Sequence, residues 1–199
     1  MTEFKDKVVL ITGAGKGTGK SLALAFAAQG AFVAANDISP LNVESVVEEI
    51  VANGGQAKAC VEDIAKKVAV QALVKNVEDD FGRIDILVNH AAVEPVSPLL
   101  DMDEWDWHRT LNVNLTGAFL VTQSVARGMR ERGSGVILNL ITEAGPKAGK
   151  TRAAYLASMA GLRGFSQQAA KELAPYGIRV HAVETDSGDV AAKIFALCR

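Results

Sequence analysis

The feature that most restricts the fold is a regular alternation of short apolar runs with longer amphipathic stretches. The runs are rich in Val and Ile and hydrophobic throughout, which is typical of strands buried on both faces of a parallel sheet. We expect strands at 7–12, 31–37, 57–62, 84–90, 135–141 and 178–183, and helices near 18–30, 41–53, 64–82, 103–132, 152–174 and 188–198. This order predicts an α/β fold with right-handed crossovers.

The fold class that follows is a Rossmann-type, doubly wound parallel sheet of about six strands with helices on both faces. A chain of 199 residues is long enough to bury one core. No linker composition and no internal repeat divides the sequence. We therefore expect residues 1–199 to form a single domain.

Composition argues against several classes of partner. Hydrophobic residues make up 49% of the chain and charged residues 22%, the profile of a soluble globular protein. The net charge of −2 gives no reason to expect a nucleic-acid or membrane surface. The first residues are charged, unlike a signal peptide, and the two cysteines lie far apart. We expect a cytoplasmic protein that binds neither nucleic acid nor membrane. Because no His, Cys or acidic residues show metal-ligand spacing, no metal is expected.

A glycine-rich turn follows the first expected strand directly. It reads TGAGKGTG over 12–19 and leads into the first expected helix. Glycine permits positive φ and close approach of phosphate, and a helix N-terminus offers free N–H groups and a partial positive charge. At the head of a chain of βα units, this turn predicts a pyrophosphate site and hence a dinucleotide-binding domain. The alternative is an ordinary tight turn.

The second expected strand ends at Asp37, eighteen residues after Gly19. A carboxylate in that place can accept hydrogen bonds from the adenosine ribose hydroxyls, and it would repel a 2′-phosphate. Lys16 acts in the opposite direction, because a base in the turn could meet that phosphate. We favour NAD as the cofactor, with NADP less favoured. Asp37 could instead be a solvated turn residue or a helix cap before Pro40.

Several motifs in the right order resemble the short-chain dehydrogenase/reductase family, including its 3-oxoacyl-carrier-protein reductase-like members. The resemblance runs from about Lys5 to Val183, nearly the whole chain. The TGxxxGxG spacing over 12–19 matches the family's form of the turn. The other matches are Asp63-Ile64 after strand three, the Asn-His-Ala-Ala segment 89–92, Asn114 within LNVNLTG, the strand GVILNLI before Thr142, and Tyr155.

The resemblance implies a hydride transfer between NAD(H) and an alcohol or carbonyl of a small molecule that the sequence does not identify. Tyr155 would be the catalytic acid/base, Thr142 would stand at the catalytic serine, and Asn114 at the catalytic asparagine. The implied cofactor contacts are Gly13, Lys16, Gly17, Thr18, Gly19, Asp37, Asp63, Ile64, Asn89 and Ala91.

The departures from the family pattern weaken the expected chemistry. The family's lysine, four residues after the tyrosine, lowers the pKa of that tyrosine and binds the nicotinamide ribose, and Met159 can do neither. The family's Asn-Asn-Ala-Gly segment has lost an asparagine to His90 and a glycine to Ala92. After Val183 the long substrate loop of the family looks deleted and its final strand is absent.

Some of these positions have two readings. His90 could lie near the nicotinamide, or it could be a structural residue at a strand end. A distant base could replace the lysine: Arg163 lies two turns beyond Tyr155, and Lys147, Lys150 and Arg152 precede it. These four side chains could equally be solvated surface charges.

Three functional hypotheses follow. The chain could be an NAD-dependent oxidoreductase weakened by Met159, with Tyr155 and Thr142 at its centre. It could be a nucleotide-binding, catalytically impaired member of the family that acts as a partner subunit or sensor. It could also be a shortened chain with an interaction role at most. The small residues along one face of helix 152–174 favour close packing, and the resemblance implies a homodimer through helices 103–132 and 152–174.

Overall fold

The computed structural model describes residues 3–141, 151–185 and 189–199. Within them, six parallel strands form one sheet, as the sequence predicts. The structure gives their order as β3-β2-β1-β4-β5-β6. The strands are β1 (Val8–Thr12), β2 (Phe32–Asp37), β3 (Gln56–Val61), β4 (Ile86–Asn89), β5 (Gly135–Ile141) and β6 (Ile178–Glu184). The strand order reverses between β1 and β4, and this is where such sheets bind ligands.

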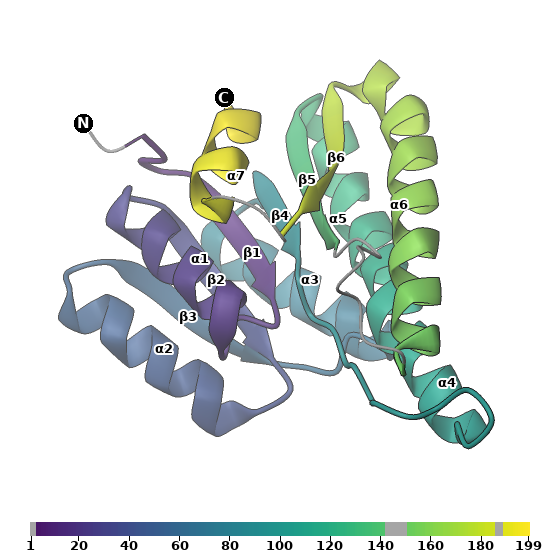
Figure 1. Ribbon diagram of the computed structural model, residues 1–199. Helices are drawn as coiled ribbons and strands as arrows, with labels where there is room; N and C mark the ends of the chain where they lie inside the picture. Colours follow the sequence, from purple (N-terminus) through teal and green to yellow (C-terminus); the bar gives the residue numbers. More distant parts are fainter. Residues whose placement is uncertain (1–2, 142–150, 186–188) are drawn as a thin grey trace.

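Helices cover both faces of the sheet (Figure 1). The helices are α1 (Gly17–Ala28), α2 (Pro40–Ala52), α3 (Lys67–Phe81), α4 (Glu104–Leu111), α5 (Ala118–Arg132), α6 (Ala153–Leu173) and α7 (Val190–Cys198). Helices α1, α2 and α7 share one apolar cluster with the sheet, and α3, α5 and α6 share another. The first two crossovers, through α1 and α2, therefore lie on one face and the next three lie on the other, which makes the fold doubly wound.

Strand β1 explains why the central runs are apolar at every position. All five of its residues are buried. Val9 and Ile11 belong to the cluster on the α1 face, whereas Val8 and Leu10 belong to the cluster on the α5 face. Because successive side chains of a strand point to opposite faces, a strand covered on both sides needs an apolar residue at each place.

The two edge strands depart from the predicted burial. Strand β3 alternates between exposed and more buried residues, and β6 is also exposed at intervals, so neither is buried throughout as predicted. Both strands lie at the ends of the sheet and have only one neighbour. A strand in that position needs apolar residues only where a helix packs on it.

The long helix predicted over 103–132 is one helical path with a π-helical turn in its middle. Asp103 begins it by accepting a hydrogen bond from the Trp105 N–H at 2.6 Å, and the π-helical turn spans Asn112–Gly117. Gly117 lies so close to Ile64 that a Cβ atom would stand 2.9 Å from its side chain. The irregularity is therefore a widened turn packed against the loop after β3.

Helix α7 closes the α1 face of the core. Its Phe195 ring lies 4.9 Å from that of Phe4 and 5.0 Å from that of Phe26, centroid to centroid, and Ile194 is fully buried. A 3₁₀ turn, η2 (Ala174–Tyr176), follows α6. Among the described residues, no helix combines the length and the apolarity that crossing a bilayer requires.

Candidate functional site

The glycine turn between β1 and α1 can be built only with glycine at several of its positions. Gly13 has a φ of 67° and Gly17 a φ of 56°, in the region that L-residues with a side chain seldom adopt. A Cβ atom on Gly19 would lie 2.2 Å from the Gly13 carbonyl oxygen, and one on Gly13 would lie 2.7 Å from the Ala91 Cα. The turn over 12–19 therefore forms a glycine cradle, in which backbone atoms are packed where side chains would otherwise stand.

The first turn of α1 keeps its amides available. Its N-cap residue is Lys16, whose exposed side chain makes no capping hydrogen bond, and the turn contains no acidic residue. Backbone N–H groups at the start of a twelve-residue helix, next to the glycine cradle, fit the pyrophosphate of a dinucleotide.

Asp37 holds its carboxylate beside this turn. Its Oδ2 accepts a hydrogen bond from the Gly15 N–H at 3.0 Å, and its Oδ1 accepts one from the Ser39 N–H at 3.0 Å. Ser39, rather than Asp37, caps α2, since its hydroxyl accepts from the Asn42 N–H. The half-buried carboxylate retains lone pairs for a ligand, because each oxygen accepts one bond from the protein.

The loop after β3 contributes to two different places. The Asp63 carboxylate accepts a hydrogen bond from the Ala65 N–H at 3.0 Å and lies outside the central cavity. Ile64 is buried and turns its side chain into that cavity. The two members of the pair implied to meet the adenine are therefore separated, because Ile64 lines the cavity and Asp63 does not.

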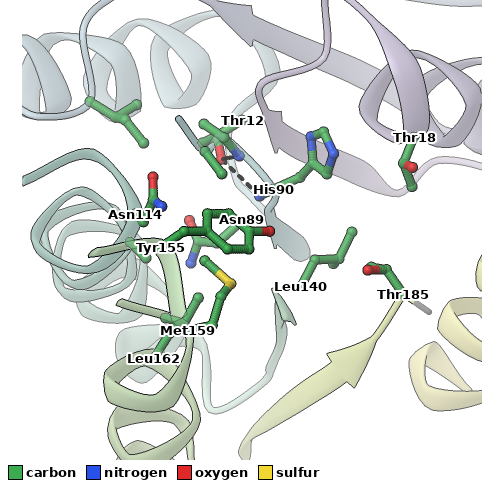
Figure 2. A pocket seen from close by; sticks show the side chains of 14 residues that line it. Thr12, Thr18, Asn89, His90, Asn114, Leu140, Tyr155, Met159, Leu162 and Thr185 are labelled. Atoms are coloured by element: carbon green, nitrogen blue, oxygen red, sulfur yellow. Dashed lines mark hydrogen bonds between the residues drawn. The ribbon is translucent and has the colours of Figure 1, made fainter. Parts of the chain in front are cut away.

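A cavity of about 200 Å³ lies at the carboxyl ends of β1, β4 and β5 (Figure 2). It brings together six of the predicted site residues, among them Tyr155, and the departures His90, Ala92 and Met159. The lining residues are Thr12, Thr18, Ile64, Asn89, His90, Ala91, Ala92, Asn114, Ala118, Leu140, Tyr155, Met159, Leu162 and Thr185. Lys16, Asp37 and Asp63 are not part of it, and Thr142 lies outside the described residues.

Tyr155 lies in an apolar setting at the start of α6. It is 8% exposed and packs with Met159, Leu162 and Ile141. Figure 2 shows its hydroxyl directed across the cavity toward Leu140. Met159, one turn further along α6, is 5% exposed, so the side chain at the family's lysine position is buried against the ring.

Arg152 lies against the face of the same ring. Its guanidinium carbon is 4.7 Å from the centroid of the Tyr155 ring, and its side chain forms an ion pair with Glu94. Arg163 instead pairs with Glu184 at 3.1 Å. Lys147 and Lys150 lie outside the described residues. Of the bases considered as substitutes for the lysine, Arg152 is thus the one whose charge is observed beside Tyr155.

The Asn114 side chain forms a latch, that is, a set of hydrogen bonds that joins the segment after β4 to α6. Its Oδ1 accepts from the Val93 N–H at 2.8 Å, and its Nδ2 donates to the Val93 carbonyl and to the Ser158 hydroxyl, both at 3.0 Å. Ser158 in turn donates to the Tyr155 carbonyl at 2.6 Å. The π-helical turn presents Asn114 to the segment after β4, and the side chain amide joins that segment to α6.

A second buried network supports the floor of the cavity. Asn89 Nδ2 donates to the Thr122 hydroxyl at 3.0 Å and to Asn139 Oδ1 at 2.8 Å, and Asn139 Nδ2 donates to the Ser166 hydroxyl at 2.8 Å. Asn89 Oδ1 is buried without a hydrogen-bond partner among the described residues. The sequence singled out Asn89 but not Ser158, Ser166 or Asn139, because these links join separate elements.

His90 supports the glycine turn. Its N–H donates to the Thr12 hydroxyl at 3.1 Å, and its Nδ1 lies 3.1 Å from the Gly13 carbonyl oxygen. Burial lowers the pKa of His90 below its ordinary value of 6.5, although the bond to Gly13 acts in the opposite direction. The neutral ring with hydrogen on Nδ1 satisfies this contact, so the geometry favours the structural reading.

The cysteines and acidic residues form no further site. Burial raises the pKa of Cys60 to about 11 and that of Cys198 to about 12, so neither thiol is activated. Within the described ranges, no group of three His, Cys, Asp or Glu side chains could hold a metal ion.

Comparison with known proteins places this geometry in a family. The profile described as short chain dehydrogenase matches residues 7–194. The chain is 42% identical over 184 residues to a 3-oxoacyl-[acyl-carrier-protein] reductase of Synechocystis sp., which covers 92% of this chain and 74% of that protein. It is 43% identical over 180 residues to the (2S)-[(R)-hydroxy(phenyl)methyl]succinyl-CoA dehydrogenase subunit BbsD of Thauera aromatica, covering 90% of this chain and 72% of that one.

Solved structures agree with the sequence relatives. An NAD⁺-bound xylitol dehydrogenase superposes with a TM-score of 0.87 at 36% identity, covering 91% of this chain and 70% of that one. A metagenomic short-chain oxidoreductase in complex with NADP superposes with a TM-score of 0.92 at 32% identity. The superposition covers 98% of this chain and 92% of that one. The two neighbours carry different dinucleotides, so this likeness does not select between NAD and NADP.

Proposed function

The chain belongs to the short-chain dehydrogenase family of oxidoreductases, and on that premise we propose that it binds NAD in preference to NADP. We propose further that it transfers hydride between NAD(H) and an alcohol or carbonyl, with proton transfer weakened by Met159. The observation that carries the proposal is the glycine cradle with the Asp37 carboxylate bonded to its Gly15 N–H at 3.0 Å. A charged acceptor fixed in that place suits ribose hydroxyls and repels a 2′-phosphate. Lys16 acts against this preference, but its side chain is exposed and makes no capping hydrogen bond in the turn.

The residues of the cavity divide the chemical work unequally. When bound, the dinucleotide supplies or accepts the hydride. Tyr155 would hold and release the proton at its hydroxyl, and Thr142 would orient the substrate oxygen. Arg152 places a positive charge over the ring of Tyr155, 4.7 Å from its centroid. Met159 adds no charge and no hydrogen-bond donor, so the proton-transfer side lacks the second group that the resemblance implies.

The test is binding followed by turnover. Purified protein is titrated with NADH while its fluorescence is followed, and oxidation of NADH is then measured with a panel of carbonyl compounds. We expect saturable binding and slow turnover, and a Met159→Lys variant should turn over faster. Absence of NADH binding contradicts the proposal as a whole.

The buried position of Met159 favours a second candidate function. In this version the chain binds the nucleotide without turning over substrate and acts as a partner subunit or sensor. Saturable binding without turnover on any carbonyl, in both the parent and Met159→Lys, is the result expected from it. The two candidate functions therefore predict the same NADH binding and differ in the turnover of carbonyl compounds.

We also propose that two copies pair through helices 103–132 and 152–174. A groove of about 330 Å³ lies between α5 and α6. It is lined by Phe119 and Phe165, by Arg127 and Arg130 on α5, and by Glu172 on α6. A two-fold axis would bring the arginines of one copy to the glutamate of the other.

The outer face of α6 supports the same pairing. Ala157, Ala160 and Gly164 are exposed, and the space around Gly164 is empty. Sedimentation at micromolar concentration should give a dimer, and Ala160→Arg should give a monomer that still binds NADH. A monomeric parent protein contradicts the pairing.

The setting and the domain organisation remain proposals of the same kind. Free Cys60 and Cys198 support a reducing, cytoplasmic location. One sheet with a core on each face supports a single domain over 1–199. Limited proteolysis that leaves one resistant fragment of nearly full length would agree with the single domain, whereas two resistant fragments would contradict it.

A further inference from the structure

The two ends of the candidate dinucleotide site differ in how many polar groups they offer to a ligand. This difference matters for a dinucleotide bound at the switch point between β1 and β4, which is the proposed function. In such sheets the adenosine half lies over the strand that follows the glycine turn, here β2, and the other half extends toward β4 and β5. The groups at each end can therefore be compared directly.

The β1–β2 end offers charge and unsatisfied donors. The first amides of α1 receive no side-chain cap from Lys16. The Asp37 carboxylate is held in place by the Gly15 and Ser39 amides and keeps lone pairs free on both oxygens. An adenosine diphosphate group thus meets preorganised donors at its phosphates and a charged acceptor at its ribose.

The β4–β5 end uses its polar side chains internally. The Thr12 hydroxyl accepts from the His90 and Ala91 amides and donates to the Val88 carbonyl. Asn114 makes three hydrogen bonds, to Val93 and Ser158, and His90 Nδ1 is bound to Gly13. These groups line the cavity, and most of their hydrogen-bonding capacity is already used by the protein. What is left to a ligand, such as the second lone pair of Asn114 Oδ1, is uncharged.

The remaining groups at this end add little charge. Both hydrogens of the Asn89 amide are donated to protein, and its Oδ1 is buried. Met159, Leu162 and Ala118 form an apolar floor under Tyr155. Among the residues that the structure describes, the lining of the cavity includes no charged side chain. The hydroxyls that complete this lining are neutral, so they bind a sugar more weakly than an ammonium would.

We infer that this site recognises its ligand through the adenosine diphosphate half, and that ADP and ADP-ribose are ligands with affinities comparable to that of NAD. A dinucleotide gains little affinity from its second ribose and its nicotinamide, because the residues around them offer apolar contact and occupied hydrogen bonds. The site is then mainly a binding site for adenine nucleotides, and hydride transfer is its weaker function.

A series of ligands of increasing size, called the ligand ladder, tests this inference on the full chain by comparing their dissociation constants. Isothermal titration calorimetry is carried out with ADP, ADP-ribose, NAD and, as a truncated ligand without the adenosine, nicotinamide mononucleotide. We expect the dissociation constants of ADP, ADP-ribose and NAD to agree within about tenfold, and nicotinamide mononucleotide not to bind. A dissociation constant for NAD more than tenfold below that of ADP overturns the inference while leaving the proposed function intact. No binding of NAD overturns the proposed function itself.

Variants at Met159 then locate the cause. In Met159→Lys, an ammonium would reach the second ribose, so the affinities for NAD and ADP-ribose should rise ~10–100-fold while that for ADP stays unchanged. Met159→Leu is the matched control, and its dissociation constants for ADP, ADP-ribose and NAD should still agree within about tenfold. A folded Met159→Lys protein with an unchanged ladder contradicts the assignment to this residue. If the lysine variant does not fold, as its melting curve would show, the ladder of the parent protein decides alone.

Discussion

The β1–β2 corner and the β4–β5–α6 side of the candidate site differ in the polar groups that they leave available to a ligand. At the corner, glycines and one carboxylate keep backbone amides and charge available to a ligand. On the other side, Asn89, Asn114 and His90 are bound to protein, and Met159 is buried beside Tyr155. Polar residues near a cavity are therefore poor evidence of ligand contact until their hydrogen bonds have been accounted for.

The difference also separates binding from chemistry. The corner supports recognition of a nucleotide, and the α6 side would supply proton transfer. Because the two functions depend on different elements, a chain can keep the first while the second weakens. Substitutions at the corner should therefore change nucleotide affinity, whereas substitutions on the α6 side should change stability or turnover.

The largest effect is expected from Gly19→Ala. The added Cβ atom would lie 2.2 Å from the Gly13 carbonyl oxygen and 2.7 Å from His90 Nδ1. The turn must shift, at a cost of ~1–3 kcal/mol in the free energy of unfolding, and NADH affinity should fall by about 100-fold or more because the amides lose their alignment. Gly164→Ala, which meets nothing within 4 Å, is the control. Equal affinities in the two variants would show that the cradle does not bind phosphate.

Asp37→Asn should act mainly on binding, with a small loss of stability, because asparagine keeps only one of the two acceptor oxygens that the Gly15 and Ser39 amides use. Removing the charge should weaken NAD by ~10–100-fold, since hydrogen bonds to charged groups contribute about 1.5–3 kcal/mol. NADP should lose less, because the repulsion of its 2′-phosphate disappears. Titrations with both cofactors measure the ratio of their affinities. Asp79→Asn removes the same charge from an exposed surface pair with Lys75 and should leave the ratio unchanged. A ratio that is also unchanged in Asp37→Asn contradicts the role of Asp37.

Arg152→Gln addresses the other side through stability. The contact between the guanidinium and the Tyr155 ring should contribute ~0.5–1 kcal/mol, so the melting temperature should fall by roughly 1–4 °C. Its control is Arg109→Gln, which removes a similar contact from the exposed Trp105 and should change the melting temperature less. Indistinguishable melting temperatures for the two variants would place Arg152 among the solvated surface charges. NADH affinity should be unaffected in both.

The smallest effect is a pH dependence that arises at His90. Burial lowers the pKa of His90 in the folded protein, so the unfolded chain binds the proton more readily as the pH falls below its ordinary value of 6.5. The contribution of His90 to stability is therefore fully present above that pH and is lost as the pH falls toward the lower, folded pKa. Its ring faces the Gly13 carbonyl, the Thr12 segment and the charge of Asp37, which oppose but do not reverse the effect of burial.

Thermal melts at pH 7.5 and pH 5.5 check this prediction. Over that interval, the melting temperature of the parent should fall further than that of His90→Asn. Burial lowers the pKa of His181 as well, with Arg179 acting in the same direction, so a residual slope of the same sign remains in both proteins. Parallel curves for the parent and His90→Asn would show that the turn does not sense the charge of this ring.

Periodicity and turn chemistry were enough to predict most of the fold. Strand 135–141 is β5 to the residue, and the helix expected over 152–174 is α6 with a short 3₁₀ turn after it. Such signals are local, since they depend on apolar residues three, four or two places apart. The uniform burial expected of strand 57–62 is wrong, because the position of β3 at the edge depends on strand order, which a local pattern does not contain.

The candidate site shows the same division. The glycine spacing, Asp37 and the Tyr155–Met159 pair are visible in the sequence because each lies within one turn or at one strand end. The Arg152–Tyr155 contact is also local, since Arg152 is the N-cap of α6 and lies three residues before Tyr155. The pairing of Glu94 with Arg152 and the latch of Asn114 on Val93 join segments that are far apart along the chain.

Residue order along the chain thus specifies the alternating elements, the cradle between β1 and α1, and the absence of a positive charge at position 159, since all of these depend on neighbours a few bonds or one helical turn away. Which polar groups stay available to a ligand is settled when the elements pack. Burial makes each donor and acceptor take whatever partner the adjoining element brings within about 3 Å, because an unpaired polar group in the core is costly.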